Sequence, residues 1–265
     1  MHKYFLVGKI NLQRHFVYRL NFVLWRVRNL VLMVSLFVFW KAIFKGQDEL
    51  LGYREAQILT YTLGIALIRS IVLASKSADL AGNIKSGAIA SWFLKPVGIF
   101  KLWFSMDMAD KILNIFFTIF ELLLVVFIFK PELVFQTNLF YLASFGVLLC
   151  LAAALFFLLS LFFSASGFWL TDVWAPNFLF MVVLLQIAGG GFFPLDILPP
   201  LFLKIIKFTP FPYMLYYPMK VYLGQISKPE VITSLLISCF WVFGIYFLVK
   251  IIWKKGLENY DAPGS

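Results

Sequence analysis

Two charged residues, Arg69 and Glu121, lie inside long apolar stretches of the sequence. A charged side chain in such a stretch is costly within a membrane and often has a function. Counted from the inner ends of their predicted helices, the two residues differ in depth by only about 6 Å, at about 1.5 Å per residue. The depths therefore allow an ion pair between helices, which would be structural or would act on a substrate or a proton. As alternatives, Arg69 extends to the inner headgroups and Glu121 is protonated among Phe and Leu side chains.

The remaining residues show no pattern that predicts catalysis. The two histidines, His2 and His15, are both near the N-terminus, and no Ser/His/Asp, HExxH or paired-carboxylate arrangement occurs. No GxxxxGK[ST] phosphate loop is present either. Cys150 and Cys239 fall in apolar stretches, where we expect buried side chains rather than a disulfide or a metal site. The sequence therefore predicts no catalytic residue, metal or cofactor on this chain, and any work it does must draw on an ion gradient or another subunit.

The elements that position these residues follow from composition. Hydrophobic residues make up 62% of the 265 and charged residues 14%, which indicates an integral membrane protein. A bilayer requires about 20 apolar residues per helix, and long unbroken runs argue against a membrane barrel. We predict an all-α, polytopic membrane protein with one domain over residues 1–265. Its six expected spanning helices are 22–44, 56–74, 112–129, 139–163, 173–193 and 231–253.

Basic residues indicate the orientation of these helices. With the N-terminus placed in the cytoplasm, the inner segments hold 14 Lys and Arg and the outer segments eight. The positive-inside rule then favours both termini in the cytoplasm. The net charge of +10 is spread along membrane edges, so we expect anionic lipid headgroups rather than nucleic acid as the counter-charge.

Residues 1–21 predict a helix that lies on the cytoplasmic leaflet. At 100° per residue, apolar side chains that include Phe5 and Ile10 share one broad arc, and Gly8 and Asn11 lie opposite. This amphipathic pattern is typical of interfacial helices. A tail that merely tethers the chain is the alternative.

A polar, helix-like segment over 77–96 stands between apolar stretches. Leu80 and Ile84 share one helical face, and a second short turn follows Gly87 and ends at a Lys-Pro pair. The pattern predicts two short helices in a cytoplasmic loop. We interpret this loop as a docking element for a partner outside the membrane, with a simple cap on the helix bundle as the alternative.

Glycine and proline interrupt the chain after the fifth stretch, over 189–212. Such residues cannot continue a helix, and non-helical backbone at membrane depth is tolerated only where protein or a water-filled cavity covers it. We expect a re-entrant hairpin that lines or plugs a path, rather than a loose extracellular loop. Its characteristic residues are Gly189, Gly190, Gly191, Phe193, Pro194, Asp196, Pro199 and Pro200. An aromatic belt at the outer interface is expected from Tyr213, Tyr216, Tyr217 and Tyr222.

Several short patterns occur in a defined order along the chain. They are KINLQR (9–14) with YRLNF (18–22), DLAGNIKSG (79–87) with LKP (94–96), GFFPLD (191–196) with LPP (198–200), PF (210–211) with YP (217–218), and KG (255–256) with Tyr260. In this order they resemble the permease subunits of type-2 ATP-binding-cassette (ABC) exporters, in the daunorubicin-resistance-like branch. The resemblance extends over the whole chain.

The resemblance implies a half-transporter with six spans in a bacterial inner or plasma membrane. Such a subunit pairs with itself or a sibling permease and is driven by two cytoplasmic ATPase subunits, which would hold ATP and Mg. The resemblance further implies a coupling helix after the second span and a lid formed by the hairpin. The implied ATPase-coupling residues are Asp79, Leu80, Asn83, Ile84, Lys85, Gly87, Lys95 and Pro96.

We therefore expect export of a hydrophobic or amphipathic cargo, which the 32 Phe suit better than a sugar or an ion. One alternative is an ion-coupled secondary transporter or channel that uses Arg69 and Glu121. It would show inverted repeats or two broken helices, whereas one Gly/Pro-interrupted region is found. A membrane-embedded enzyme or assembly factor acting on lipid, with Asp172 or Asp196 near an interface, is a second alternative.

Overall fold

Long helices dominate the computed structural model, which describes residues 2–17, 19–75, 79–93, 98–170, 172–258 and 260. Five helical units among these residues are long and apolar enough to cross a membrane. They are α2 (Arg19–Ile43), α3 (Glu55–Val72), α6 (Ile99–Phe129), α7 (Leu139–Ser164) with the 3-10 turn η2 (Ala165–Phe168), and α11 (Lys228–Glu258). The prediction of a polytopic helical membrane protein is confirmed.

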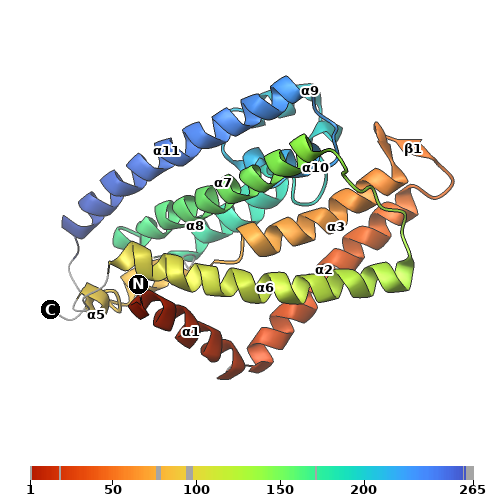
Figure 1. Ribbon diagram of the computed structural model, residues 1–265. Helices are drawn as coiled ribbons and strands as arrows, with labels where there is room; N and C mark the ends of the chain where they lie inside the picture. The colour runs from red at the N-terminus through yellow and green to blue at the C-terminus, as the bar shows by residue number, and fades with distance from the viewer. Residues whose placement is uncertain are drawn as a thin grey trace.

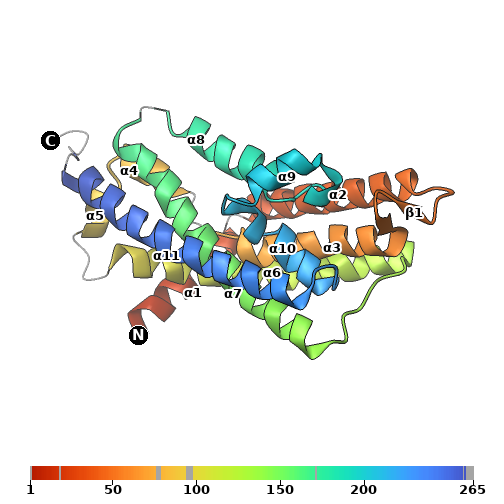
Figure 2. The same ribbon diagram turned by 90° about the horizontal axis from the view of Figure 1, so that it is seen from above.

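The long helices run roughly along one direction, so the molecule has two distinct ends (Figures 1 and 2). One end holds α1 (His2–Val17), the short helices α4 (Leu80–Lys85) and α5 (Ala90–Phe93), and the last turns of α11. A hairpin of β1 (Glu49–Leu50) and β2 (Tyr53–Arg54) lies at the other end and joins α2 to α3. Its turn residues Leu51 and Gly52 both have positive φ, as a two-residue hairpin of this hand requires.

The fifth predicted span is shorter in the structure than the sequence indicated. Instead of 173–193, the chain is helical over α8 (Trp174–Phe178) and the π-helix η3 (Leu179–Ala188). These 15 residues extend about 22 Å as an α-helix, less than the roughly 30 Å of a bilayer core. The helix ends at Ala188, immediately before the three-glycine run of 189–191. Glycine ends it there because glycine stabilises a helix less than any other residue except proline.

Helix α6 begins at Ile99 rather than at residue 112, so the loop before it is shorter than expected. No glycine or proline interrupts residues 99–129, and α1 packs against the first half of this helix. The small residue Gly8 allows that approach, since a Cβ there would lie 3.3 Å from the Ser105 carbonyl oxygen. The apolar side chains of α1, such as Phe5 at 73% exposure, point away from the protein, as an interfacial helix requires.

The core lies between α3, α7, α10 (Tyr216–Tyr222) and α11. Helix α7 packs along α11, and α3 contacts α2, α6 and α7. The outward faces of α6 and α11 stay apolar, with Phe127 at 78% and Phe240 at 69% exposure. Exposed apolar faces of this size are typical of a surface that meets lipid or another subunit.

Two expectations about side-chain burial are wrong. Tyr213, Tyr216 and Tyr217 are buried in the core, and Tyr222 packs against it, so these tyrosines form no exposed belt. Tyr213 in the turn η5 (Phe211–Tyr213) stacks on Tyr217 with ring centroids 4.6 Å apart, and the packing of the hairpin over α10 turns both rings inward. The side chain of Cys150 is exposed and that of Cys239 is partly exposed.

Candidate functional site

The three-glycine run after η3 forms a buried break in the chain. All three glycines are buried, and each carbonyl oxygen accepts a hydrogen bond from another element. The Tyr216 backbone N–H donates to Gly189 at 3.1 Å, the Tyr61 hydroxyl to Gly190 at 2.7 Å, and the Arg69 Nη2 to Gly191 at 2.6 Å. Non-helical backbone at membrane depth must be satisfied in this way, so α3 and α10 hold the break in place.

Glycine is required at the centre of this break. Gly190 has φ +77°, and a Cβ there would lie 2.8 Å from the Tyr61 hydroxyl. The left-handed conformation is costly for other residues. The local sequence thus creates a sharp turn that places the Phe192 ring centroid 5.9 Å from the Arg69 guanidinium of α3.

Replacing Gly190 with alanine is expected to lower the free energy of unfolding by about 1–2 kcal/mol, the cost of a side chain in the left-handed region. The Cβ would also displace the Tyr61 hydroxyl from its carbonyl partner. Thermal unfolding in mild detergent measures the loss. Gly244→Ala in α11 is the control, since its Cβ would meet nothing within 4 Å; an equal effect of both substitutions would contradict the requirement.

Arg69 and Glu121 do not pair, so the predicted intramembrane pair is wrong. Arg69 turns toward the three-glycine run, where its Nη2 donates to the side-chain oxygen of Gln186 in η3 and to Gly191. Glu121 points toward α2 instead. Similar depth allowed the pair, but the rotation of α3 and α6 about their axes places the two side chains on different faces.

Glu121 forms a buried ion pair with Arg26 of α2, a partner that the sequence reasoning missed. The guanidinium Nε donates to the carboxylate Oε1 at 2.8 Å, and Nη2 lies 2.5 Å from Oε2. The same guanidinium donates to Asn114 at 3.0 Å and to Thr118 at 3.1 Å. The spacing of Asn114, Thr118 and Glu121 puts them on one face of α6, which is a signal that could have revealed the site.

A second polar network, partly buried, joins the predicted re-entrant hairpin to the β hairpin of β1 and β2. Lys220 of α10 donates from Nζ to Asp196 at 2.7 Å, to the Tyr53 hydroxyl at 3.0 Å and to Gln225 at 2.8 Å. The Tyr53 hydroxyl donates to both oxygens of Asp196, at 2.7 and 2.9 Å. Asp196 lies in the 3-10 turn η4 (Leu195–Ile197), so the network joins η4, α10 and the β hairpin. Lys220 and Tyr53 were not among the predicted site residues, because 143 residues separate Tyr53 from Asp196.

The rest of the hairpin holds the short helix α9 (Pro200–Ile206), with Pro199 immediately before it and Pro200 at its start. Proline is favoured there because its missing N–H has no partner in a first helical turn. Phe193 packs against the buried cluster around Phe37, and Pro194 is buried. Leu201 at 70% exposure and Phe208 at 83% exposure lie outward. Whether this helix enters a membrane leaflet stays a prediction.

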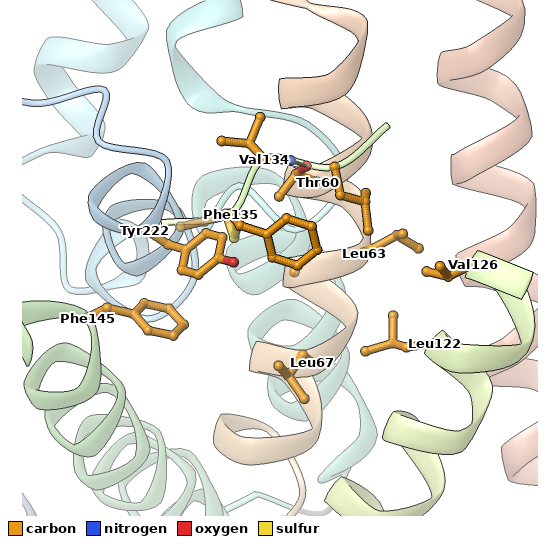
Figure 3. A pocket seen from close by; sticks show the side chains of 12 residues that line it. Thr60, Leu63, Leu67, Leu122, Val126, Val134, Phe135, Phe145 and Tyr222 are labelled. Atoms are coloured by element: carbon orange, nitrogen blue, oxygen red, sulfur yellow. Dashed lines mark hydrogen bonds between the residues drawn. The ribbon is translucent and has the colours of Figure 1, made fainter. Parts of the chain in front are cut away.

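A separate apolar pocket lies beside α3 (Figure 3). It has a volume of about 190 Å³ and lies between α3, α6, α7 and α10. The segment that follows α6 closes one end, where the Val134 N–H donates to the Thr60 hydroxyl at 2.9 Å. The ring of Phe135 and that of Tyr222 face the pocket (Figure 3). Its lining suits a hydrocarbon chain rather than a polar ligand.

The predicted coupling segment is two short helices separated at Gly87, as expected. Gly87 has φ +77°. Leu80 and Ile84 are fully buried in the core, so they fix the segment to the bundle and cannot be its docking surface. Asp79 and Lys85 are exposed and Asn83 is partly exposed. Lys95 and Pro96 lie outside the described residues.

Several contacts anchor α4 to the bundle. A Cβ on Gly167 of η2 would lie 2.6 Å from the Ala81 carbonyl oxygen, so the two backbones nearly touch. The Tyr260 hydroxyl, beyond the end of α11, donates to the Ile84 carbonyl at 2.9 Å. Trp253 in α11 donates to the Leu161 carbonyl in α7 at 3.0 Å. The segment is therefore joined to both α7 and α11.

Polar contacts also join α1, α3 and α6 near the coupling segment. Asn11 donates to Asp110 at 2.6 Å. Lys111 Nζ donates to the carbonyl oxygens of Val72 at 2.9 Å and Ala74 at 3.0 Å, which satisfies the end of α3. In the described part of the chain, no group of three or more His, Cys, Asp or Glu could hold a metal ion.

These features define a polytopic α-helical membrane protein in which the helix formed by α8 and η3 ends inside the bundle at the three-glycine run. The family model described as ABC-2 family transporter protein matches residues 30–264. The chain therefore belongs to the ABC-2 transporter family. No similar curated protein and no similar solved structure was found.

Membership of this family makes the chain an integral membrane component of an ABC transporter, which in general works with an ABC ATPase. The match begins at residue 30, so α1 and the start of α2, including Arg26 and Arg28, precede it. The interpretation as a secondary transporter loses its main support, because Arg69 and Glu121 do not form the pair on which it rested.

Proposed function

We propose that this chain is the permease subunit of an ABC exporter that moves a hydrophobic or amphipathic cargo by ATP hydrolysis on separate subunits. The observation that carries the proposal is the segment of α4 and α5, which lies at one end of the bundle (Figure 1). Leu80 and Ile84 of α4 are buried in the core, and Lys85 is exposed. A short helix with this division suits contact with a soluble partner.

The attachment of α4 explains how force on this segment would reach the membrane helices. Contacts with η2, and through Tyr260 with the residues after α11, make α4 part of the same packed unit as α7 and α11. Packed units move as rigid bodies rather than deform continuously. Closure of two ATPases would therefore rock α7 and α11 together and open a path where two permeases meet.

The ATPase subunits would hold ATP and Mg, and the second permease would be an identical or a sibling chain. The cytoplasmic side would be the end with α1, α4 and α5, in a bacterial inner or plasma membrane. The order of the short sequence patterns favours the daunorubicin-resistance-like branch, and the apolar pocket beside α3 favours a cargo with a hydrocarbon part.

Co-purification in mild detergent tests the proposed assembly. The chain is expressed with the proteins encoded beside it, and stoichiometric partners are identified by mass spectrometry. We expect a soluble protein with a GxxxxGK[ST] phosphate loop, and the permease bands distinguish one kind of permease from two. Recovery of the folded chain alone would contradict the proposal.

Replacing Lys85 with alanine is expected to weaken transport-linked ATPase activity about fivefold or more, as for a contact worth over 1 kcal/mol in an interface. Lys85 is exposed at the end of α4, so thermal unfolding should not change. Activity is measured with the purified complex in proteoliposomes. Lys45→Ala, at an exposed position beside the opposite end, is the matched control. Unchanged coupling in both Lys85→Ala and Asp79→Asn would contradict the docking assignment.

A further inference from the structure

Arg69 differs from Arg26 in having no acidic partner among the described residues. Arg26 has Glu121 as a counter-ion. Arg69 donates from Nη2 to Gln186 and Gly191, whose acceptor oxygens are neutral. Its Nε is buried with no hydrogen-bond partner. An uncompensated charge and an unsatisfied donor are both costly within a membrane protein. An anion bound at Arg69 would therefore be stabilised.

A second arginine lies at the same level of the bundle. Helices α2 and α3 are neighbours and run antiparallel through the short β hairpin. Arg28 is 15 residues before the end of α2 at Ile43, and Arg69 is 14 residues after the start of α3 at Glu55. At about 1.5 Å per residue the two stand at nearly equal depth.

Arg28 also lacks an acidic partner in the part of the chain that the structure describes. Its Nη2 is 3.4 Å from Asn29, and its guanidinium stacks over the Trp25 ring at 3.9 Å. Two like charges at one depth repel each other, and an anion between them would remove that repulsion.

We propose that Arg28 and Arg69 form a binding site for the anionic headgroup of a phospholipid at the level of the predicted cytoplasmic leaflet. Planar guanidinium groups bind phosphate with two parallel hydrogen bonds. The exposed apolar side chains of α2 beside Arg28, Val27 and Val31, offer a surface for the acyl chains. The site stands on the geometry of the two arginines; that its lipid is the cargo rests on the proposed export function.

The site also gives the three-glycine break a link to the ligand. The Arg69 guanidinium holds the Gly191 carbonyl and lies 5.9 Å from the centroid of the Phe192 ring. A phosphate drawn to Arg69 would therefore share a guanidinium with the backbone that begins the hairpin. Headgroup binding and the position of the hairpin are coupled through one side chain.

Lipid binding to the purified full-length chain tests the proposal. Native mass spectrometry in mild detergent compares dioleoyl phosphatidylglycerol with dioleoyl phosphatidylcholine, which share acyl chains and differ in net charge. We expect preferential binding of phosphatidylglycerol. Arg28→Gln and Arg69→Gln should each weaken it about tenfold, the loss of a hydrogen bond to a charged group, and leave phosphatidylcholine unchanged. Arg54→Gln, at an exposed position of β2, is the control.

Equal affinity of the wild-type chain for the two lipids would overturn the proposal, as would unchanged phosphatidylglycerol binding in both variants. If Arg69→Gln fails to fold because the hairpin loses its contact, Arg28→Gln decides, since the structure shows no hydrogen bond from Arg28 to the hairpin. Displacement of the lipid by inorganic phosphate at the same affinity would overturn the assignment to a lipid.

The results distinguish failure of the lipid-binding site from failure of the proposed export function. Lys85→Ala should retain the preference for phosphatidylglycerol, because Lys85 is exposed on α4, whereas Arg28 contacts Asn29 and Trp25 and Arg69 donates to Gln186 and Gly191. An ATPase that co-purifies with a permease showing no lipid preference would refute the anion site alone. A lipid preference without an ATPase partner would refute the export function alone.

Discussion

Replacing Glu121 with leucine is expected to lower the free energy of unfolding by about 3–5 kcal/mol, the range for removing one partner of a buried ion pair. The substitution leaves the Arg26 guanidinium, whose side chain is 9% exposed, with only the neutral oxygens of Asn114 and Thr118. An uncompensated charge then stays buried between α2 and α6. Denaturation in mixed micelles, followed by circular dichroism, measures the change.

The double variant Arg26→Met with Glu121→Leu separates the ion pair from simple packing. Apolar residues of similar volume in place of both partners leave no charge buried, so most of the stability should return. Glu258→Gln is a matched control, because Glu258 faces Lys254 at 4.0 Å on an exposed surface, where ion pairs contribute little. A double variant as unstable as the single one would show that the charge is not the cause.

Replacing Asp196 with asparagine is expected to cost about 2–4 kcal/mol, since Lys220 is buried and would lose its counter-ion. The partial exposure of Asp196, 30% for its side chain, keeps the value below that of a fully buried pair. Burial, together with the Asp196 carboxylate, raises the pKa of Tyr53 far above its usual range, so its hydroxyl stays protonated and cannot replace the lost charge. Hydrogen exchange should rise over η4 and the start of α9.

Tyr53→Phe removes a neutral donor from the same network and should cost only about 1 kcal/mol. Asp48→Asn, at an exposed position before the β hairpin, is the matched control and should leave both stability and exchange unchanged. If Asp196→Asn had no larger effect than Tyr53→Phe, the network would be held by hydrogen bonds alone, without a contribution from the ion pair.

Features that depend on local sequence were predicted well. Hydropathy over about 20 residues identified the helices at 22–44, 139–163 and 231–253, close to the observed α2, α7 and α11. Gly87 marked the division between α4 and α5, and the Gly/Pro-rich stretch from residue 189 marked the interruption after η3, although the span itself was predicted to continue to 193. Burial of apolar length in lipid and the conformational freedom of glycine act within a few residues, so the sequence carries both signals directly.

Features that depend on which helix faces which were not predicted. Arg69 and Glu121 have similar depths, yet the orientation of each helix about its axis directs Glu121 toward Arg26 and Arg69 toward the three-glycine run. The depth of a residue in the membrane follows from its own position in the sequence. An ion pair between two helices also requires that both helices turn the charged residues toward each other.

The sequence by itself therefore determined the class of protein, the approximate spans, the Gly/Pro-rich interruption from residue 189 and the absence of a GxxxxGK[ST] loop from this chain. The tertiary structure alone decided the partner of each buried charge and the inward packing of Tyr213 and Tyr217. It also decided that Leu80 and Ile84 anchor α4 rather than dock a partner. The physical reason is that hydrophobic length and backbone freedom are properties of a segment, while a counter-ion or a buried ring depends on residues from distant segments that only packing brings together.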